Sequence, residues 1–182
     1  MRVVIAEDLF LEFGDRHTAA KTYHHLGMIA QEQRRFEEAE ANYHKALDLL
    51  LEFRDRHTAA KTYHQLGLVA QEQRQFEEAE ASYRKALDIF LETDKRSASG
   101  EASSLGILLA TLSRHVEAAE TLLGAAVSWH QLTGDFDPVD LQWLNRERQH
   151  VGDAAFTQMV SANVPQDLQK TLMAAIDNSG EP

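Results

Sequence analysis

Apolar residues recur three and four positions apart through most of the chain, which is the period of an α-helix with one buried face. Within residues 51–90 two such series follow each other: Tyr63, Leu66 and Ala70, then Phe76, Ala79, Tyr83 and Ala86. They predict helices at 56–73 and 76–92, joined by a tight turn in the polar stretch from Gln71 to Gln75. Asp55 is expected to cap the first helix, because its carboxylate can accept a hydrogen bond from a free backbone N–H.

The same pattern occurs in tandem. Residues 11–50 align without gaps with residues 51–90, and 31 of the 40 pairs are identical. A degraded third copy follows, in which Val116-Glu117-Ala118-Ala119-Glu120 lies 40 positions after the equivalent segment of the second copy. A period of this length is typical of stacked helical repeats, because one unit cannot bury its own apolar face.

The repeat divides the chain into five segments. Residues 14–53, 54–93 and 94–133 are expected to form repeats 1, 2 and 3, the third being degenerate. Residues 1–13 match the end of a repeat and are expected to form the truncated second helix of a preceding one. Residues 134–182 are expected to form a helical C-terminal cap, with helices at 138–150, 153–162 and from Val164-Pro165 onward. Asp137 and Pro138 have the residue types preferred at an N-cap and at the first helical position.

The repeated positions resemble the tetratricopeptide repeat, whose pattern is an aromatic residue, Leu-Gly, a small residue, Ala, an aromatic residue and Ala. Seven positions match this spacing in each of two copies: Tyr23, Leu26, Gly27, Ala30, Ala39, Tyr43 and Ala46, and then Tyr63, Leu66, Gly67, Ala70, Ala79, Tyr83 and Ala86. The small residues are expected to let paired helices approach closely. The period of 40 residues is longer than the family's repeat of about 34 residues. The proline that the family has late in its repeat is absent, and Leu91 lies near its place.

The longer unit resembles the repeats of kinesin light chains and of bacterial STAND-type signalling ATPases. The resemblance covers about residues 1–133. It implies an all-α fold: a right-handed superhelical stack of antiparallel helix pairs (an α-solenoid) with C-terminal capping helices.

The resemblance also implies a binding surface, because in this family the first helix of each pair lines a concave face. On these helices one stripe is rotated away from the core positions. It consists of Lys21, His24, Met28 and Gln31 in repeat 1 and of Lys61, His64, Leu68 and Gln71 in repeat 2. We expect these residues to line a groove that binds an extended peptide or a partner helix; the alternative is an ordinary solvated helix face. In the third copy the Lys/His pattern ends, so a basic pocket would be short.

Charge and composition narrow the classes of partner. There are 18 Lys and Arg residues against 29 Asp and Glu residues, a net charge of −11, which opposes binding to nucleic acid and to anionic membranes. No apolar window approaches the roughly 18 residues of a membrane span, and the N-terminus lacks the apolar stretch of a signal peptide. We therefore expect a cytoplasmic protein. Without cysteine, the chain has no disulfide and no thiolate metal site.

No catalytic constellation stands out. A phosphate-binding loop, a nucleophile elbow and a His-Glu-x-x-His motif are all missing. His17 and His24, like His57 and His64, are seven positions apart, which is about 10 Å along a helix and too far for one zinc ion. We therefore expect no metal site, no cofactor and no enzyme activity. The histidines are expected to act as neutral donors that become charged below pH ~6.5.

Two functions remain open. The first is a non-catalytic protein–protein interaction module that binds a peptide or partner helix in the groove. The alternative is the ligand-sensing regulatory arm of a larger STAND-type ATPase or transcription regulator, which an upstream reading frame encoding a nucleotide-binding domain would favour. Residues 1–13 would lack a partner helix, so the chain is expected to form homo-oligomers through Val4, Ile5, Leu9 and Phe10.

Overall fold

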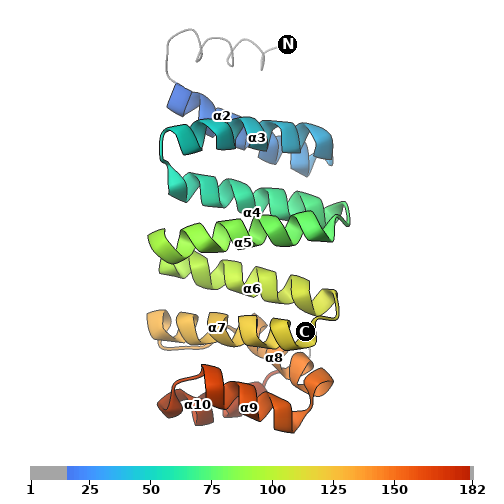
Figure 1. Ribbon diagram of the computed structural model, residues 1–182, viewed down its shortest axis with the longest axis vertical. Coiled ribbons are helices and arrows are strands. Elements are labelled where there is room, and N and C mark those ends of the chain that lie inside the picture. Colours follow the sequence, from blue (N-terminus) through green and yellow to red (C-terminus); the bar gives the residue numbers. More distant parts are fainter. Residues whose placement is uncertain (1–15, 181–182) are drawn as a thin grey trace. The chain divides into compact units, whose positions relative to one another are not determined.

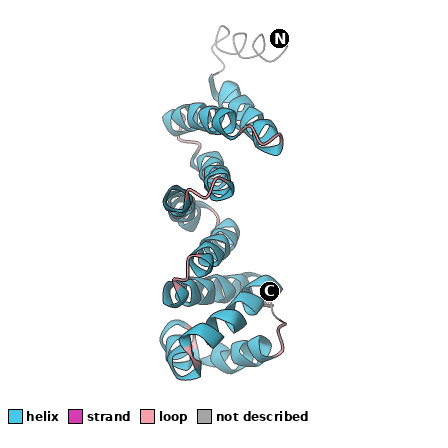
Figure 2. Ribbon diagram, turned by 90° about the vertical axis from the view of Figure 1, so that its right-hand side faces the viewer, coloured by secondary structure: helices cyan, strands magenta, loops and turns pink. Residues whose placement is uncertain are grey.

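The computed structural model describes residues 16–180. The expectations for residues 1–13, including self-association through Val4, Ile5, Leu9 and Phe10, lie outside this part of the chain. The described residues form helices joined by short loops, with no strand among them (Figure 2). The all-α fold built from helix pairs is thereby confirmed. The chain divides into two compact units, Met1–Thr93 and Asp94–Pro182.

In its described part the first unit contains four helices: α2 (Arg16–Glu32), α3 (Phe36–Glu52), α4 (Arg56–Glu72) and α5 (Phe76–Thr93). Helix α2 packs on α3, α3 on α4 and α4 on α5, so neighbours in the sequence are neighbours in space (Figure 1). The bounds of α4 and α5 agree to within one residue with the helices predicted from the apolar spacing. The tight turn predicted between them is residues 73–75.

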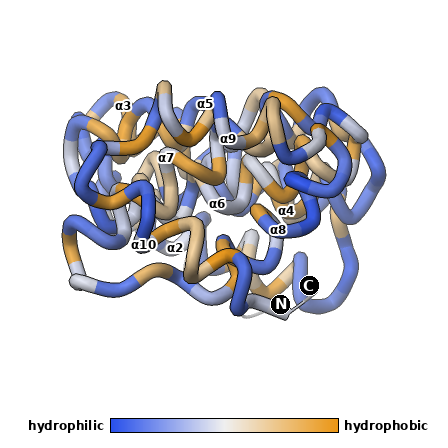
Figure 3. Tube along the Cα trace, turned by 90° about the horizontal axis from the view of Figure 1, so that it is seen from below, coloured by the Kyte–Doolittle hydropathy of each residue, from blue (hydrophilic) through white to orange (hydrophobic). Residues whose placement is uncertain are grey.

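Hydrophobic and hydrophilic positions alternate along the helices, as amphipathic sequences require (Figure 3). The buried residues of the first unit combine small alanines with a few large side chains, among them Tyr43, Leu50, Tyr83 and Phe90. No helix among residues 16–180 is both long enough and apolar enough to cross a membrane.

Each repeat of the first unit places a glycine of its first helix against a tyrosine of its second. A Cβ atom added to Gly67 would lie 2.5 Å from the ring of Tyr83, and one added to Gly27 would lie 2.5 Å from the ring of Tyr43. Both rings are buried, with 1% and 0% exposure for Tyr83 and Tyr43. The close approach of paired helices predicted from the small residues is confirmed at these positions.

In each of the turns that follow α2, α3 and α4, one residue has a left-handed backbone conformation. Arg34, Arg54 and Arg74 have φ angles of 58°, 56° and 61°. After α4 the N–H of Arg74 donates to the carbonyl of Gln71 at 3.0 Å, and the next N–H donates to the carbonyl of Ala70 at 2.8 Å. This is the Schellman pattern of hydrogen bonds, which usually has glycine at the left-handed position.

Arg74→Gly should therefore stabilise the first unit by about 1 kcal/mol, because a side chain in this conformation costs roughly 1–2 kcal/mol and glycine's entropy offsets only part of that. The Arg74 side chain is exposed, so removing it breaks no buried contact. Urea unfolding measures the change. The matched control is Gln75→Gly at the next residue, where φ is not positive; this variant should lose stability. A loss at both positions would contradict the expectation.

In its described part the second unit contains five helices: α6 (Lys95–Thr111), α7 (His115–Thr133), α8 (Pro138–Val151), α9 (Asp153–Asn163) and α10 (Gln166–Asp177). Helix α6 packs on α7, and α7 packs on α8 and α9. The α6–α7 pair repeats the close contact of the first unit with a leucine in place of tyrosine, since a Cβ atom on Gly106 would lie 2.7 Å from Leu122.

Helices α8 and α9 pack on α7, and α10 packs on α8 and α9. One cluster joins Leu122, Leu123 and Ala126 of α7 to side chains from each of these helices: Leu144, Phe156, Val160, Leu172 and Ile176. All eight of these side chains are 0–2% exposed.

Aspartates begin helices in both units. Asp55 accepts a hydrogen bond from the Thr58 N–H at 3.1 Å before α4, and Asp137 accepts one from the Val139 N–H at 2.8 Å before α8. Both predicted N-caps are therefore confirmed. Asp94 has the same role before α6.

Candidate interaction groove of the first unit

The residues predicted to line a groove lie on α2 and α4, the first helices of the two repeats. Three of them, Lys21, Met28 and Lys61, are exposed. The other five are partly buried: His24, Gln31, His64, Leu68 and Gln71. The predicted stripe therefore contains side chains open to a ligand and side chains engaged with other parts of the protein.

The two glutamines are held by tyrosines of the second helices. The Tyr43 hydroxyl donates to Gln31 Oε1 at 2.8 Å, and the Tyr83 hydroxyl donates to Gln71 Oε1 at 2.9 Å. Burial, with a further contribution from the charge of Glu32, raises the pKa of Tyr43, so this hydroxyl stays protonated and remains a donor. The tyrosines thus fix the orientation of both amides. The N–H group of Gln31 then donates to Glu72 Oε1 at 3.5 Å.

His24 joins α2 to α4. Its Nδ1 lies 2.9 Å from Thr62 Oγ1, and the Thr62 hydroxyl donates its own proton to the Thr58 carbonyl at 2.9 Å. A hydroxyl has one proton, so Nδ1 of His24 is the donor in its contact with Thr62. Burial, followed by the charges of His25 and Lys61, lowers the pKa of His24 from 6.5. His24 is therefore an inter-repeat contact that becomes charged only at more acidic pH than expected from the sequence.

The surface between α2 and α4 is hollowed. The depression has a volume of about 360 Å³ and is lined by Met28, Gln31, Glu32, Arg34, Gln65 and Glu72. Met28 and Gln31 were among the predicted residues, and the other six predicted residues do not line it. Its other four lining residues were missing from the prediction.

Three of those missed residues lie at or just beyond helix ends. Glu32 and Glu72 are the last residues of α2 and α4, and Arg34 is the left-handed residue of the turn after α2. Arg34 Nη1 lies 3.8 Å from Glu72 Oε2. Helical rotation predicts which residues share a stripe on one helix, but it carries no signal for charges that the chain brings together at the ends of two helices.

Several polar side chains on α2 and α4 remain available, among them Lys21, Lys61, Gln65 and the acidic Glu32. Among the described residues Lys21, Lys61 and Gln65 make no hydrogen bond or ion pair with another side chain. With the exposed thioether of Met28, they provide two amines, one amide and one flexible apolar group. This combination suits a ligand that has both a charged group and an apolar group.

In the described part of the chain, one group of histidine and acidic residues comes close enough to share a metal ion. It is His115, Glu147 and His150 in the second unit. The histidine pairs His17/His24 and His57/His64 do not belong to it. His17, for example, contacts Asp55 instead, with Nε2 and Oδ2 3.0 Å apart. The sequence signal that could have found the group is the Glu147-x-x-His150 spacing.

Comparisons with known proteins agree with this architecture. Residues 18–92 match a family model described as "Tetratricopeptide repeat". No curated protein gave a significant sequence match.

Several solved structures are similar in fold. BtubC (BKLC) from P. vanneervenii is 20% identical, with a TM-score of 0.64 over 99% of this chain and 82% of that one. The apo form of RapI is 14% identical, with a TM-score of 0.74 over 95% and 73% of the two chains. A putative kinesin light chain from Podosopora anserina with nearly identical TPR-like repeats is 14% identical, with a TM-score of 0.60 over 98% and 96%. At these identities the likeness shows the fold alone.

Proposed function

We propose that the chain binds a short segment of a partner protein between α2 and α4, from the premise that residues 18–92 match the tetratricopeptide-repeat family. The repeat fold is that of a protein–protein interaction scaffold, and proteins of this family generally bind protein partners. The observation that carries the proposal is the set of available groups on these two helices: Lys21, Met28, Lys61 and Gln65.

The spacing of these groups indicates the chemistry of the peptide. Lys21 and Met28 are seven positions apart on α2, which is about 10 Å along the helix axis. An extended peptide covers about 10 Å with three residues. A peptide that has a carboxylate three residues from an apolar side chain would therefore match both groups. The Gln65 amide can hydrogen-bond with the peptide backbone between them.

The lining of the depression supports binding without large rearrangement. Gln31 is already held by Tyr43, so little side-chain entropy remains to be lost there when a ligand binds. Met28 is unbranched and polarizable, which lets it adapt to apolar side chains of different shape. A fixed polar wall beside an adaptable apolar one favours a family of related peptides over a single ligand.

Charge reversal of the two lysines tests the proposal. Peptides would first be selected from a random phage-displayed library on residues 1–182, and their affinity would then be measured by isothermal titration calorimetry. The double variant Lys21→Glu, Lys61→Glu should bind at least about tenfold more weakly, which is about 1.4 kcal/mol. Because both lysines are exposed, far-UV circular dichroism should show unchanged helicity.

The control is Lys170→Glu, which reverses the charge of one lysine at an exposed position of α10 in the second unit and is compared with each single lysine variant as well as with the double one. It should leave the affinity within about twofold of the original, as expected for an exposed charge that is not part of the binding site. Equal losses in the control and in the double variant would show that only net charge matters. Unchanged affinity in both would mean that the peptides bind elsewhere.

The regulatory-arm alternative would use the same face. A sensing arm of a larger STAND-type ATPase or transcription regulator also needs a surface that recognises a ligand, and the lysine variants address the surface common to both functions. We propose no catalytic step for either, since the Thr62 hydroxyl beside His24 is 0% exposed and donates its proton to the Thr58 carbonyl.

A further inference from the structure

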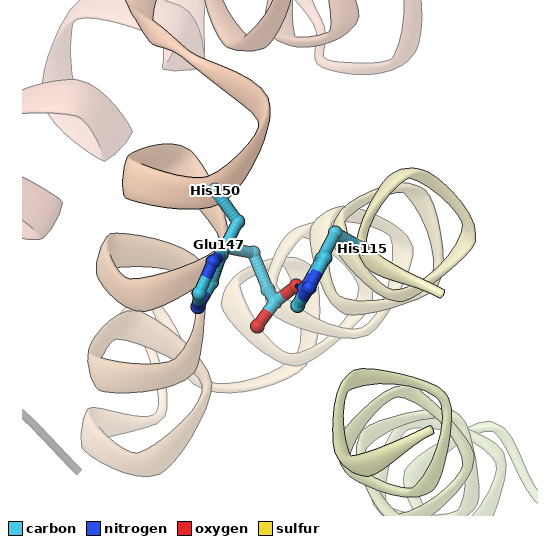
Figure 4. A group of neighbouring side chains, drawn as sticks. All are labelled: His115, Glu147 and His150. Atoms are coloured by element: carbon cyan, nitrogen blue, oxygen red, sulfur yellow. Dashed lines mark hydrogen bonds and ion pairs between the residues drawn. The ribbon is translucent and has the colours of Figure 1, made fainter. Parts of the chain in front are cut away.

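Three side chains of the second unit, all outside the groove, converge where α7 begins and α8 ends (Figure 4). His115 is the first residue of α7, and Glu147 and His150 lie in the last part of α8. His115 Nδ1 lies 2.7 Å from Glu147 Oε2. The rings of His115 and His150 stack, with centroids 4.0 Å apart and planes inclined by 12°. One donor atom of each residue lies within 4.8 Å of those of the other two.

Glu147 is the unusual member of this group. Its side chain is 0% exposed, whereas 26% of the His115 side chain is exposed. Its Oε2 contacts His115, but its Oε1 is buried and has no hydrogen-bond partner among the described residues. A buried carboxylate oxygen without a partner is unfavourable, because the protein does not replace the hydrogen bonds lost with water. This oxygen is therefore a position that a cation would stabilise.

The residue types and their spacing point to a metal ion. Glu147 and His150 are three positions apart on one helix, so they project from the same face. This Glu-x-x-His spacing is the one with which helical bundles present two ligands to an ion. Two imidazoles with one carboxylate favour zinc and neighbouring transition metals over magnesium or calcium, which prefer oxygen ligands alone.

We propose that His115, Glu147 and His150 bind a divalent transition-metal ion of the zinc class, which ties the start of α7 to the end of α8. Bonds of about 2.0 to 2.2 Å in tetrahedral geometry place ligand atoms about 3.3 Å apart. The ion takes the place of the proton between His115 and Glu147, whose atoms move slightly apart. The two rings tilt out of their stack so that their lone pairs converge, and His150 is free to do so because it is exposed. Three protein ligands leave the fourth position for water.

Titration with Co²⁺ and Zn²⁺ tests the proposal on residues 1–182, prepared without a histidine tag and treated with chelator. Co²⁺ should give the visible absorption of a tetrahedral site and saturate at one equivalent per chain. Calorimetry with Zn²⁺ should show the same stoichiometry with a micromolar or tighter dissociation constant. His150→Ala should weaken binding by more than about tenfold. Because His150 is exposed, this variant should keep the fold.

Two further variants make the test decisive. Glu147→Gln keeps the size of the buried side chain but removes its charge, and should also weaken binding by more than about tenfold. His44→Ala removes an exposed histidine of α3 in the first unit and should leave binding unchanged. Weak binding that does not saturate would overturn the proposal. So would stoichiometric binding that survives His150→Ala or is lost in His44→Ala.

Discussion

Gly67→Ala should destabilise the first unit by about 2 kcal/mol. The added Cβ would lie 2.5 Å from Cε1 and 2.6 Å from Cδ1 of Tyr83. This ring cannot easily move aside, because it is 1% exposed and its hydroxyl is bonded to Gln71. Overpacking of this kind costs roughly 1–3 kcal/mol or more, and the better helix propensity of alanine returns at most about 1 kcal/mol. Urea unfolding measures the net loss, and Gly27→Ala should repeat it in the equivalent contact.

Gly124→Ala is the matched control for this substitution. Gly124 lies inside α7, is exposed, and has no neighbouring atom within 4 Å of an added Cβ. At this position alanine brings only its better helix propensity, so the variant should be more stable than the original chain by about 0.5–1 kcal/mol. Opposite signs at positions 67 and 124 would establish that the helix pair needs close contact. A gain at both positions would show that the Gly67–Tyr83 contact is looser than described.

Asp140→Asn should stabilise the second unit at neutral pH. Asp140 is 2% exposed, and this burial raises its pKa from 3.8 to about 6. A hydrogen bond from Ser103 opposes the rise, and the charge of Asp137 adds to it. Between these two values the folded chain binds more protons than the unfolded chain, so stability falls as pH rises from about 4 to about 6. The loss at pH 7 is about 2–3 kcal/mol. Asparagine does not titrate and can still accept the Ser103 hydrogen bond.

The measurement is the difference in unfolding free energy between Asp140→Asn and the original chain across pH. This difference should be smallest near pH 4 and should grow to about 2–3 kcal/mol at pH 7. The control is Asp167→Asn, at an exposed position in the first turn of α10. Its difference in unfolding free energy should be small and should not grow between pH 4 and pH 7 as that of Asp140→Asn does. A constant difference for Asp140→Asn across the range would exclude a buried carboxyl with a raised pKa.

The helices could be predicted because their signals are local. The apolar period predicted α4 and α5 to within one residue, and Asp55 and Asp137 marked helix starts through hydrogen bonds to residues two or three positions away. The close helix contact was also predictable, since Gly67 recurs as Gly27 at the family's small position. Each of these inferences needs only one helix or one pair of neighbouring helices.

The candidate sites were predicted less well because they depend on distance in space. The sequence identified Met28 and Gln31, but it did not indicate that the turn residue Arg34 approaches Glu72 on another helix. It also treated His24 as open to a ligand, whereas Thr62 of the next repeat contacts it. His115 and Glu147 are 32 positions apart, so only the packing of α7 on α8 brings them together.

Methionine methyl NMR tests the proposed groove most directly. The chain has four methionines: Met28 lines the depression, Met159 and Met173 pack against the core of the second unit, and Met1 lies outside the described residues. In a chain with isotopically labelled methyl groups, Met28→Leu identifies the Met28 signal. Titration with a selected peptide should shift that signal in a saturable way while the Met159 and Met173 signals stay in place. Saturable binding in calorimetry that leaves the Met28 signal unmoved would contradict the account.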